Sequence, residues 1–81
     1  MSTRLVMILP NQEAKYLSTI DPVKFQTIRY AKEFQTVSDA KRFVLEHMYE
    51  FVIFCELKGI SMKDLFIESF ENEITRQEIV V

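Results

Sequence analysis

Apolar side chains are most regular between Thr36 and Lys58, where they recur at helical spacing on two opposite faces of one segment. Laid out at 100° per residue, one arc holds Ala40, Phe43, Val44, His47, Met48, Phe51, Phe54 and Cys55. The opposite side holds Leu45, Tyr49, Val52 and Ile53. Because a helix that is apolar on both sides needs partners on both, the pattern predicts a sandwiched helix of about 22 residues.

Local signals mark both ends of this helix. Thr36 and Asp39 have the spacing of a capping box, in which the hydroxyl accepts from the first turn and the carboxylate reaches back to the cap. Gly59 follows Lys58 at the place where a left-handed residue ends a helix. A strand over residues 50–57 is the competing interpretation, but residues 46–49 contain no turn-forming residue to separate it from a preceding helix.

The first third of the chain has the pattern of strands. Leu5–Leu9 is an unbroken apolar run, as expected for a strand buried on both faces, and Pro10 ends it. Residues 12–19 fit either a short helix or the first strand of a hairpin. The turn pattern of Asp21–Lys24 and the strand-like residues 25–30 favour the hairpin.

The last third predicts a second helix. Ser61 and Asp64 form another capping-box pattern, followed by apolar positions at helical spacing: Met62, Leu65, Phe66, Phe70 and Ile74. Residues 78–81 fit a closing edge strand or a frayed end. Residues 1–81 are therefore expected to form a single α+β domain: a small antiparallel sheet of two to four strands packed on one long helix, followed by a short second helix.

Composition and charge restrict the function. A chain of 81 residues with 48% hydrophobic side chains and one Gly is folded but small, so association would help to stabilise it. The net charge of −2 is uneven: residues 1–42 carry seven basic and four acidic side chains (+3), and residues 43–81 carry three and eight (−5). This unevenness fits either two oppositely charged surfaces or simple scatter.

The chain offers little material for catalysis. It has one Cys and one His, so neither an internal disulfide nor a tetrahedral zinc site can form from one copy. Cys55 and His47 are separated by about 12 Å along a helix, and no Gly-rich phosphate loop is present. We therefore expect both side chains in the core, no enzymatic activity, no cofactor and no metal. Apolar runs too short to span a bilayer, together with a lone cysteine, indicate a cytoplasmic protein without membrane contact.

The segment from Lys15 to Phe43 resembles small accessory proteins of phages that infect Gram-positive bacteria. The resemblance rests on the runs Lys-Tyr-Leu-Ser-Thr-Ile-Asp (15–21), Ala-Lys-Glu-Phe-Gln-Thr (31–36) and Asp-Ala-Lys-Arg-Phe (39–43). In those proteins two strands precede a helix with an Ala-x-x-Phe pattern. The resemblance implies a hairpin packed on a helix and a mobile-element setting.

A second resemblance covers residues 56–70, which are similar to the turn and second helix of ribbon-helix-helix repressors and more loosely to helix-turn-helix domains. It implies a dimer whose paired strand enters the major groove, with Gln26, Arg29 and Lys32 as the base-reading candidates. The chain departs from this family in its longer first helix and its three strand candidates. The acidic side chains after Lys63 also disfavour nucleic acid as a partner.

The sequence thus predicts a non-enzymatic protein-binding accessory or inhibitor protein of a phage or mobile element, acting as a homodimer by surface occlusion. Its interface, with itself or with an unidentified host or phage protein, is expected at Leu45, Tyr49, Val52 and Ile53. The monomeric alternative has the second helix folding back over these residues. The alternative function is a small dimeric ribbon-helix-helix DNA-binding repressor.

Overall fold

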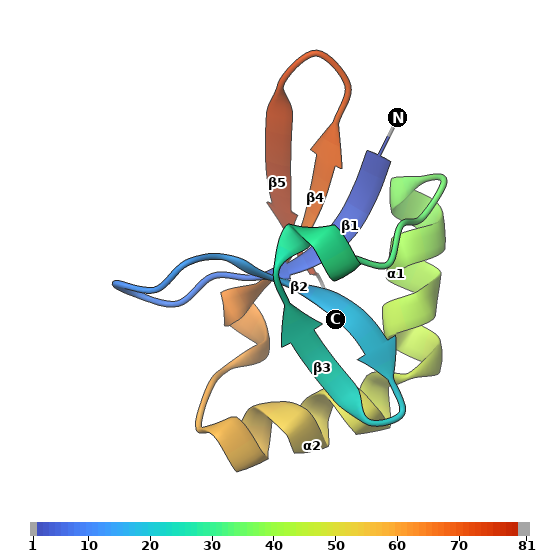
Figure 1. Ribbon diagram of the computed structural model, residues 1–81. Coiled ribbons are helices and arrows are strands. Elements are labelled where there is room, and N and C mark those ends of the chain that lie inside the picture. The colour runs from blue at the N-terminus through green and yellow to red at the C-terminus, as the bar shows by residue number, and fades with distance from the viewer. Residues whose placement is uncertain (1, 80–81) are drawn as a thin grey trace.

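Five antiparallel strands form one sheet with two helices on one side of it in the computed structural model, which describes residues 2–79 (Figure 1). The elements are β1 (Ser2–Met7), β2 (Lys15–Ile20), β3 (Val23–Gln26), the 3-10 turn η1 (Ile28–Tyr30), α1 (Val37–Glu46), α2 (Met48–Lys58), the 3-10 turn η2 (Met62–Asp64), β4 (Leu65–Phe70) and β5 (Ile74–Glu78). The strand order is β3-β2-β1-β4-β5. The α+β class is confirmed, and the sheet has more strands than the two to four expected.

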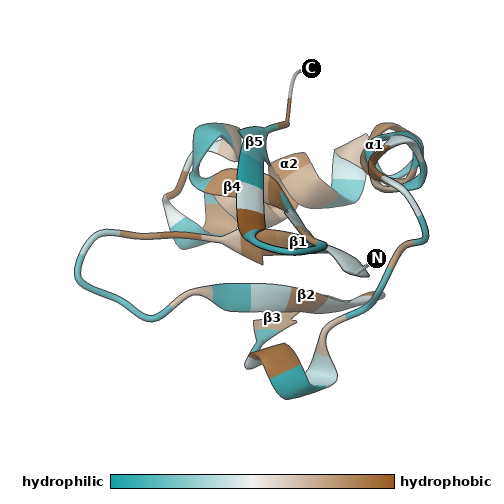
Figure 2. Ribbon diagram, turned by 90° about the horizontal axis from the view of Figure 1, so that it is seen from above, coloured by the Kyte–Doolittle hydropathy of each residue, from teal (hydrophilic) through white to brown (hydrophobic). Residues whose placement is uncertain are grey.

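The sheet opens between β1 and β2. Strand β1 pairs with β4 along its whole length, but with β2 only at Val6 and Met7. Where the two strands separate, the backbone N–H groups of Lys32 and Phe34 donate to carbonyl oxygens of β2 and β1, at 2.8 Å each. In Figure 2, β2 and β3 lie below β1 and the two helices above it. Strand β3 still packs on α2, where the ring centroids of Phe25 and Phe54 are 5.3 Å apart.

The core lies between the sheet and the helices. Alternate side chains of the strands face the helices, as the twofold periodicity of a strand requires. The buried set comprises Leu5, Leu17, Leu65 and Ile67 from the strands, Ala40, Val44, Phe51 and Cys55 from the helices, and Ile79. The helical arc predicted to face the sheet is therefore confirmed, because all four helical core residues belong to it.

The single long helix is wrong, because the helix breaks at His47 (φ −117°, ψ 25°). A straight helix of 22 residues would be about 33 Å long, whereas a six-residue strand spans about 20 Å. Much of a straight helix would thus extend beyond the sheet. The break lets α1 and α2 run in different directions, so each packs a buried pair of residues into the core (Figure 1).

The helical region begins after Thr36 and ends at Gly59, as the sequence predicts. The Thr36 hydroxyl accepts from the backbone N–H of Asp39 at 3.0 Å. The Asp39 carboxylate, however, pairs with Arg42 and does not reach back to the cap. Gly59 has φ 69° and ψ 31°, the left-handed conformation that ends α2.

The predicted second helix is wrong. The capping box forms, with the Ser61 N–H donating to the Asp64 carboxylate at 2.9 Å, but it caps only the short turn η2. From Leu65 onward the chain is a strand, because Leu65 and Ile67 alternate into the core and the backbone pairs with β1. The closing edge strand exists as β5, earlier than predicted; residues 80–81 of the prediction lie outside the described residues.

The N-terminal hairpin is confirmed. Strands β2 and β3 pair on either side of the turn at Asp21 and Pro22, so residues 15–19 are strand and not helix. The turn is shorter than the predicted Asp21–Lys24, because β3 already begins at Val23. The strand predicted to continue to Tyr30 ends at Gln26, and the 3-10 turn η1 follows. The first strand is confirmed with a shift, as Ser2–Met7 in place of Leu5–Leu9.

An ionic row crosses the sheet on the face away from the helices. Glu68 on β4 is 1% exposed, and its carboxylate accepts from Arg76 Nε at 2.9 Å and lies 3.8 Å from Arg4. Burial and the neighbouring Glu68 raise the pKa of the Tyr16 hydroxyl, which Arg76 partly offsets. A buried carboxylate needs charged partners, so Glu68 has a structural role. It is not one of the exposed acidic side chains of a second helix that the sequence predicts.

Candidate protein-binding surface and adjoining pocket

The outer side of α2 carries an apolar ridge that faces away from the core. This α2 ridge consists of Tyr49, Ile53 and Leu57, spaced four residues apart along the helix. Tyr49 is 76% exposed and Leu57 81%, while Ile53 is half-buried. Leaving such a side chain in water forgoes about 1.5–3 kcal/mol relative to burial, so the ridge favours a covering partner.

The α2 ridge coincides in part with the interface predicted from the sequence. Tyr49, Val52 and Ile53 remain together on α2, but the break at His47 puts Leu45 on α1. Within residues 2–79 no second helix folds back over Tyr49, which the monomeric alternative required. The sequence reasoning missed Leu57, although its spacing of four residues from Ile53 was the signal that could have found it.

A groove of about 300 Å³ runs beside the ridge. Its other wall is the turn of the β2–β3 hairpin, which contributes Ile20, Pro22 and Val23. Two carboxylates, Asp21 and Glu50, also line the groove. The hairpin therefore widens the apolar surface of the α2 ridge into a concave site, where a partner side chain could be enclosed on two sides.

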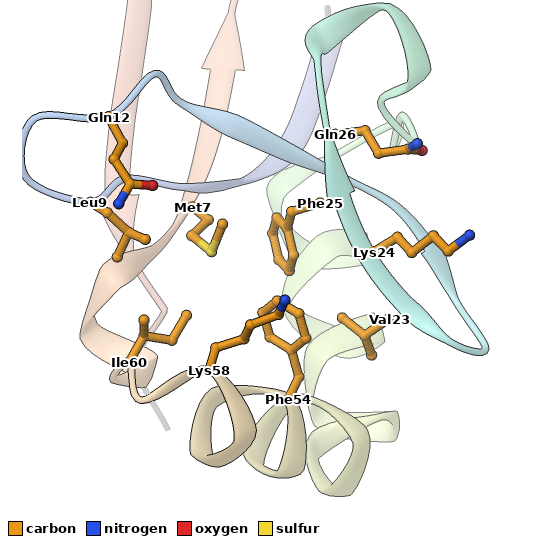
Figure 3. A pocket seen from close by; sticks show the side chains of 10 residues that line it. All are labelled: Met7, Leu9, Gln12, Val23, Lys24, Phe25, Gln26, Phe54, Lys58 and Ile60. Atoms are coloured by element: carbon orange, nitrogen blue, oxygen red, sulfur yellow. The ribbon is translucent and has the colours of Figure 1, made fainter.

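A larger pocket of about 510 Å³ adjoins the C-terminal end of α2 (Figure 3). Its apolar lining is Met7, Leu9, Val23, Phe25, Phe54 and Ile60. The rings of Phe25 and Phe54 pack with their centroids 5.3 Å apart, and the Lys58 ammonium lies 6.0 Å from the centroid of Phe54. Val23 and Phe54 line the groove as well, so the groove and the pocket form one continuous surface.

Of the three DNA-contact candidates, Gln26 ends β3, whereas Arg29 and Lys32 lie between β3 and α1; each makes contacts within the chain. Gln26 accepts a hydrogen bond from the Ser18 hydroxyl at 2.6 Å. The Arg29 guanidinium lies 5.8 Å from the centroid of the Tyr30 ring, and the Lys32 ammonium lies over the Phe34 and Phe43 rings. Arg29 belongs to a 3-10 turn and Lys32 to a connecting segment, so the three side chains do not form one strand face.

Cys55 and His47 have separate surroundings. The Cys55 thiol is buried beside the Met62 sulfur at 3.6 Å, and burial, with a smaller effect of Asp64, raises its pKa. His47 is half-buried, with its ring centroid 4.5 Å from that of Phe43 and its Nδ1 3.7 Å from the Glu50 carboxylate. A raised thiol pKa lowers the thiolate fraction, which makes Cys55 a poor nucleophile.

In comparisons with known proteins, no family model, no curated protein and no solved structure matches this chain. Among residues 2–79, no group of three or more His, Cys, Asp or Glu side chains is arranged to hold a metal ion. The helices in the same part of the chain are too short and too polar to cross a membrane. The α2 ridge, its groove and the pocket are therefore the features from which a function is argued.

Proposed function

We propose that this protein is a non-enzymatic protein-binding module that forms a homodimer through the α2 ridge and acts by covering the surface of a host or phage protein. The observation that supports the proposal best is the exposure of Tyr49 and Leu57 on a helix whose other side is already in the core. A solvent-exposed ridge of this kind is typical of an interaction site.

A second copy fits the ridge by symmetry. Tyr49 and Leu57 lie four residues on either side of Ile53. In an antiparallel pair of α2 helices related by a two-fold axis at Ile53, Tyr49 of each copy meets Leu57 of the other. The Tyr49 ring of each copy then packs against the Leu57 side chain of the other, so the same contact forms twice. This is the self-complementarity that a two-fold interface needs.

The biological setting in the proposal comes from the sequence. Resemblance to phage accessory proteins over residues 15–43 supports a role as an accessory or inhibitor protein of a phage or mobile element. The free, buried thiol of Cys55 fits the reducing cytoplasm in which such a protein would meet its host target.

Light scattering of the Tyr49→Glu, Leu57→Glu double variant tests the dimer. Both positions are highly exposed, so the fold should survive, whereas four carboxylates in one two-fold interface should separate the copies. The parent should have twice the 9.6 kDa chain mass and the variant the chain mass. Ile74→Glu is the matched control, because Ile74 is 57% exposed on β5 and should leave the dimer intact. A parent of single-chain mass up to its solubility limit would contradict the proposal.

A ribbon-helix-helix repressor is the alternative expected from the sequence, but residues 65–70, which the resemblance makes its second helix, form β4. A gel shift with random duplex DNA separates the two functions. The binder should bind DNA more weakly than about 10⁻⁴ M at moderate salt, since residues 43–81 carry eight acidic and only three basic side chains. Micromolar binding that weakens steeply with salt and is lost in Arg29→Gln would favour the repressor.

A further inference from the structure

The pocket at the C-terminal end of α2 combines apolar walls with one cation (Figure 3). The side chain of Lys58 extends along the Phe54 ring, and within residues 2–79 its ammonium makes no ion pair. Gln12, from the β1–β2 loop, adds a neutral amide beside Leu9. The lining contains no Asp or Glu.

We propose that this pocket binds a small amphipathic carboxylate. The alkyl or aryl body of the ligand lies against the Phe25–Phe54 pair, and its carboxylate meets the Lys58 ammonium. The pocket adjoins the dimer contact of the proposed function but shares no lining residue with the α2 ridge, so the proposal does not depend on the dimer. Its volume of about 510 Å³ falls within the range of small-molecule sites, about 300–1,000 Å³.

Charge and polarity in the pocket select this class of ligand. A cation would meet Lys58 without any carboxylate to compensate it, and a compact anion such as phosphate would leave the apolar walls in contact with water. The other charged lining residue, Lys24, directs its side chain away from the cavity, as Gln26 does (Figure 3). Selection by charge therefore rests on Lys58.

Titrations followed by NMR test the proposal with a series of probes. Affinity should rise from hexanoate to octanoate to decanoate by about fourfold for each methylene that enters the pocket. Decanol should bind more weakly than decanoate, and decyltrimethylammonium more weakly still. Backbone signals of Met7, Phe25 and Ile60, and methyl signals of Met7 and Ile60, should shift together in each decanoate titration.

A pair of lysine variants tests the role of the charge. Lys58→Met should weaken decanoate binding about fivefold, the effect of one ion contact in water, and leave decanol binding unchanged. Lys58→Arg should restore the preference for the carboxylate. Lys41→Met is the matched control, because Lys41 is exposed on α1 and outside the pocket.

Three outcomes would overturn the proposal. One is equal affinity for decanoate and decyltrimethylammonium in the parent protein. Another is a set of shifts confined to the α2 ridge, which would mean binding to the helix surface. The third is a change of the Met7 and Phe25 signals with protein concentration alone, which would assign the pocket to a second copy of the chain.

Discussion

The two helices of this protein differ in how their apolar side chains are distributed, and α2 carries more of them than α1. Helix α1 buries Ala40 and Val44 and directs charged residues such as Lys41 and Arg42 to solvent. Helix α2 buries Phe51 and Cys55, but its outer side is apolar as well. An amphipathic helix is satisfied by one core, whereas a helix apolar all round needs a second partner.

The difference between the helices makes the outer side of α2 the surface to examine for function. Helix α1 completes the fold, whereas α2 contributes its inner side to the core and leaves the α2 ridge on its outer side exposed to solvent. The two sides of α2 should consequently respond differently to substitution: inner positions should affect stability, and outer positions should affect association.

Truncation in the core is expected to have the largest effect. Phe51→Ala should lower the free energy of unfolding by about 3–5 kcal/mol, because it leaves a cavity beneath α2 at a position with no solvent exposure. In urea denaturation at low protein concentration, the matched change Leu57→Ala on the same helix should stay within about 0.5 kcal/mol of the parent. Similar losses at both positions would show that the two sides of α2 are not distinct.

Loss of the cap of α1 should have a smaller effect. Thr36→Ala removes the acceptor for the Asp39 N–H and should lower the free energy of unfolding by about 1 kcal/mol in the same assay. The exposed Ser38, inside the first turn, is the control, and Ser38→Ala should change stability by a few tenths of a kcal/mol at most. If the Thr36 variant is as stable as the parent, tertiary packing alone holds the start of α1.

Features fixed by nearby residues could be predicted from the sequence. The Thr36 cap, the Gly59 end and the hairpin turn at Asp21 and Pro22 each depend on a few consecutive residues. Two of the three residues of the α2 ridge could be predicted for the same reason, since helical spacing alone puts Tyr49 and Ile53 on one side.

Features that depend on distant pairings could not be predicted. Residues 65–70 fit a helix by their own spacing, and pairing with β1, 58–68 positions away in the chain, makes them a strand. The break at His47 could not be predicted either, because no Gly or Pro lies near it in the sequence. We attribute the break to the sheet, which is too short for a straight helix of 22 residues. The pocket was hidden as well, because its lining comes from β1, the following loop, β3, α2 and Ile60.

The smallest expected effect concerns the thiol on the inner side of α2. Because burial raises the pKa of Cys55, the folded protein keeps the thiol proton at a pH where the unfolded chain loses it. Stability from this group is complete below the unfolded thiol pKa of about 8.5 and declines as pH rises above it. Urea denaturation between neutral and alkaline pH should show a decline that is smaller in Cys55→Ala.

The same thiol offers a chemical comparison of the two sides of α2. In the Tyr49→Glu background, where the ridge stays uncovered, iodoacetamide at neutral pH should modify Cys55 at least about tenfold more slowly than a cysteine introduced by Leu57→Cys with Cys55→Ala. The reason is that Cys55 is 4% exposed and Leu57 81%. Equal rates would mean that the inner side of α2 opens to solvent as readily as the ridge, which would remove the distinction between the core and the binding surface.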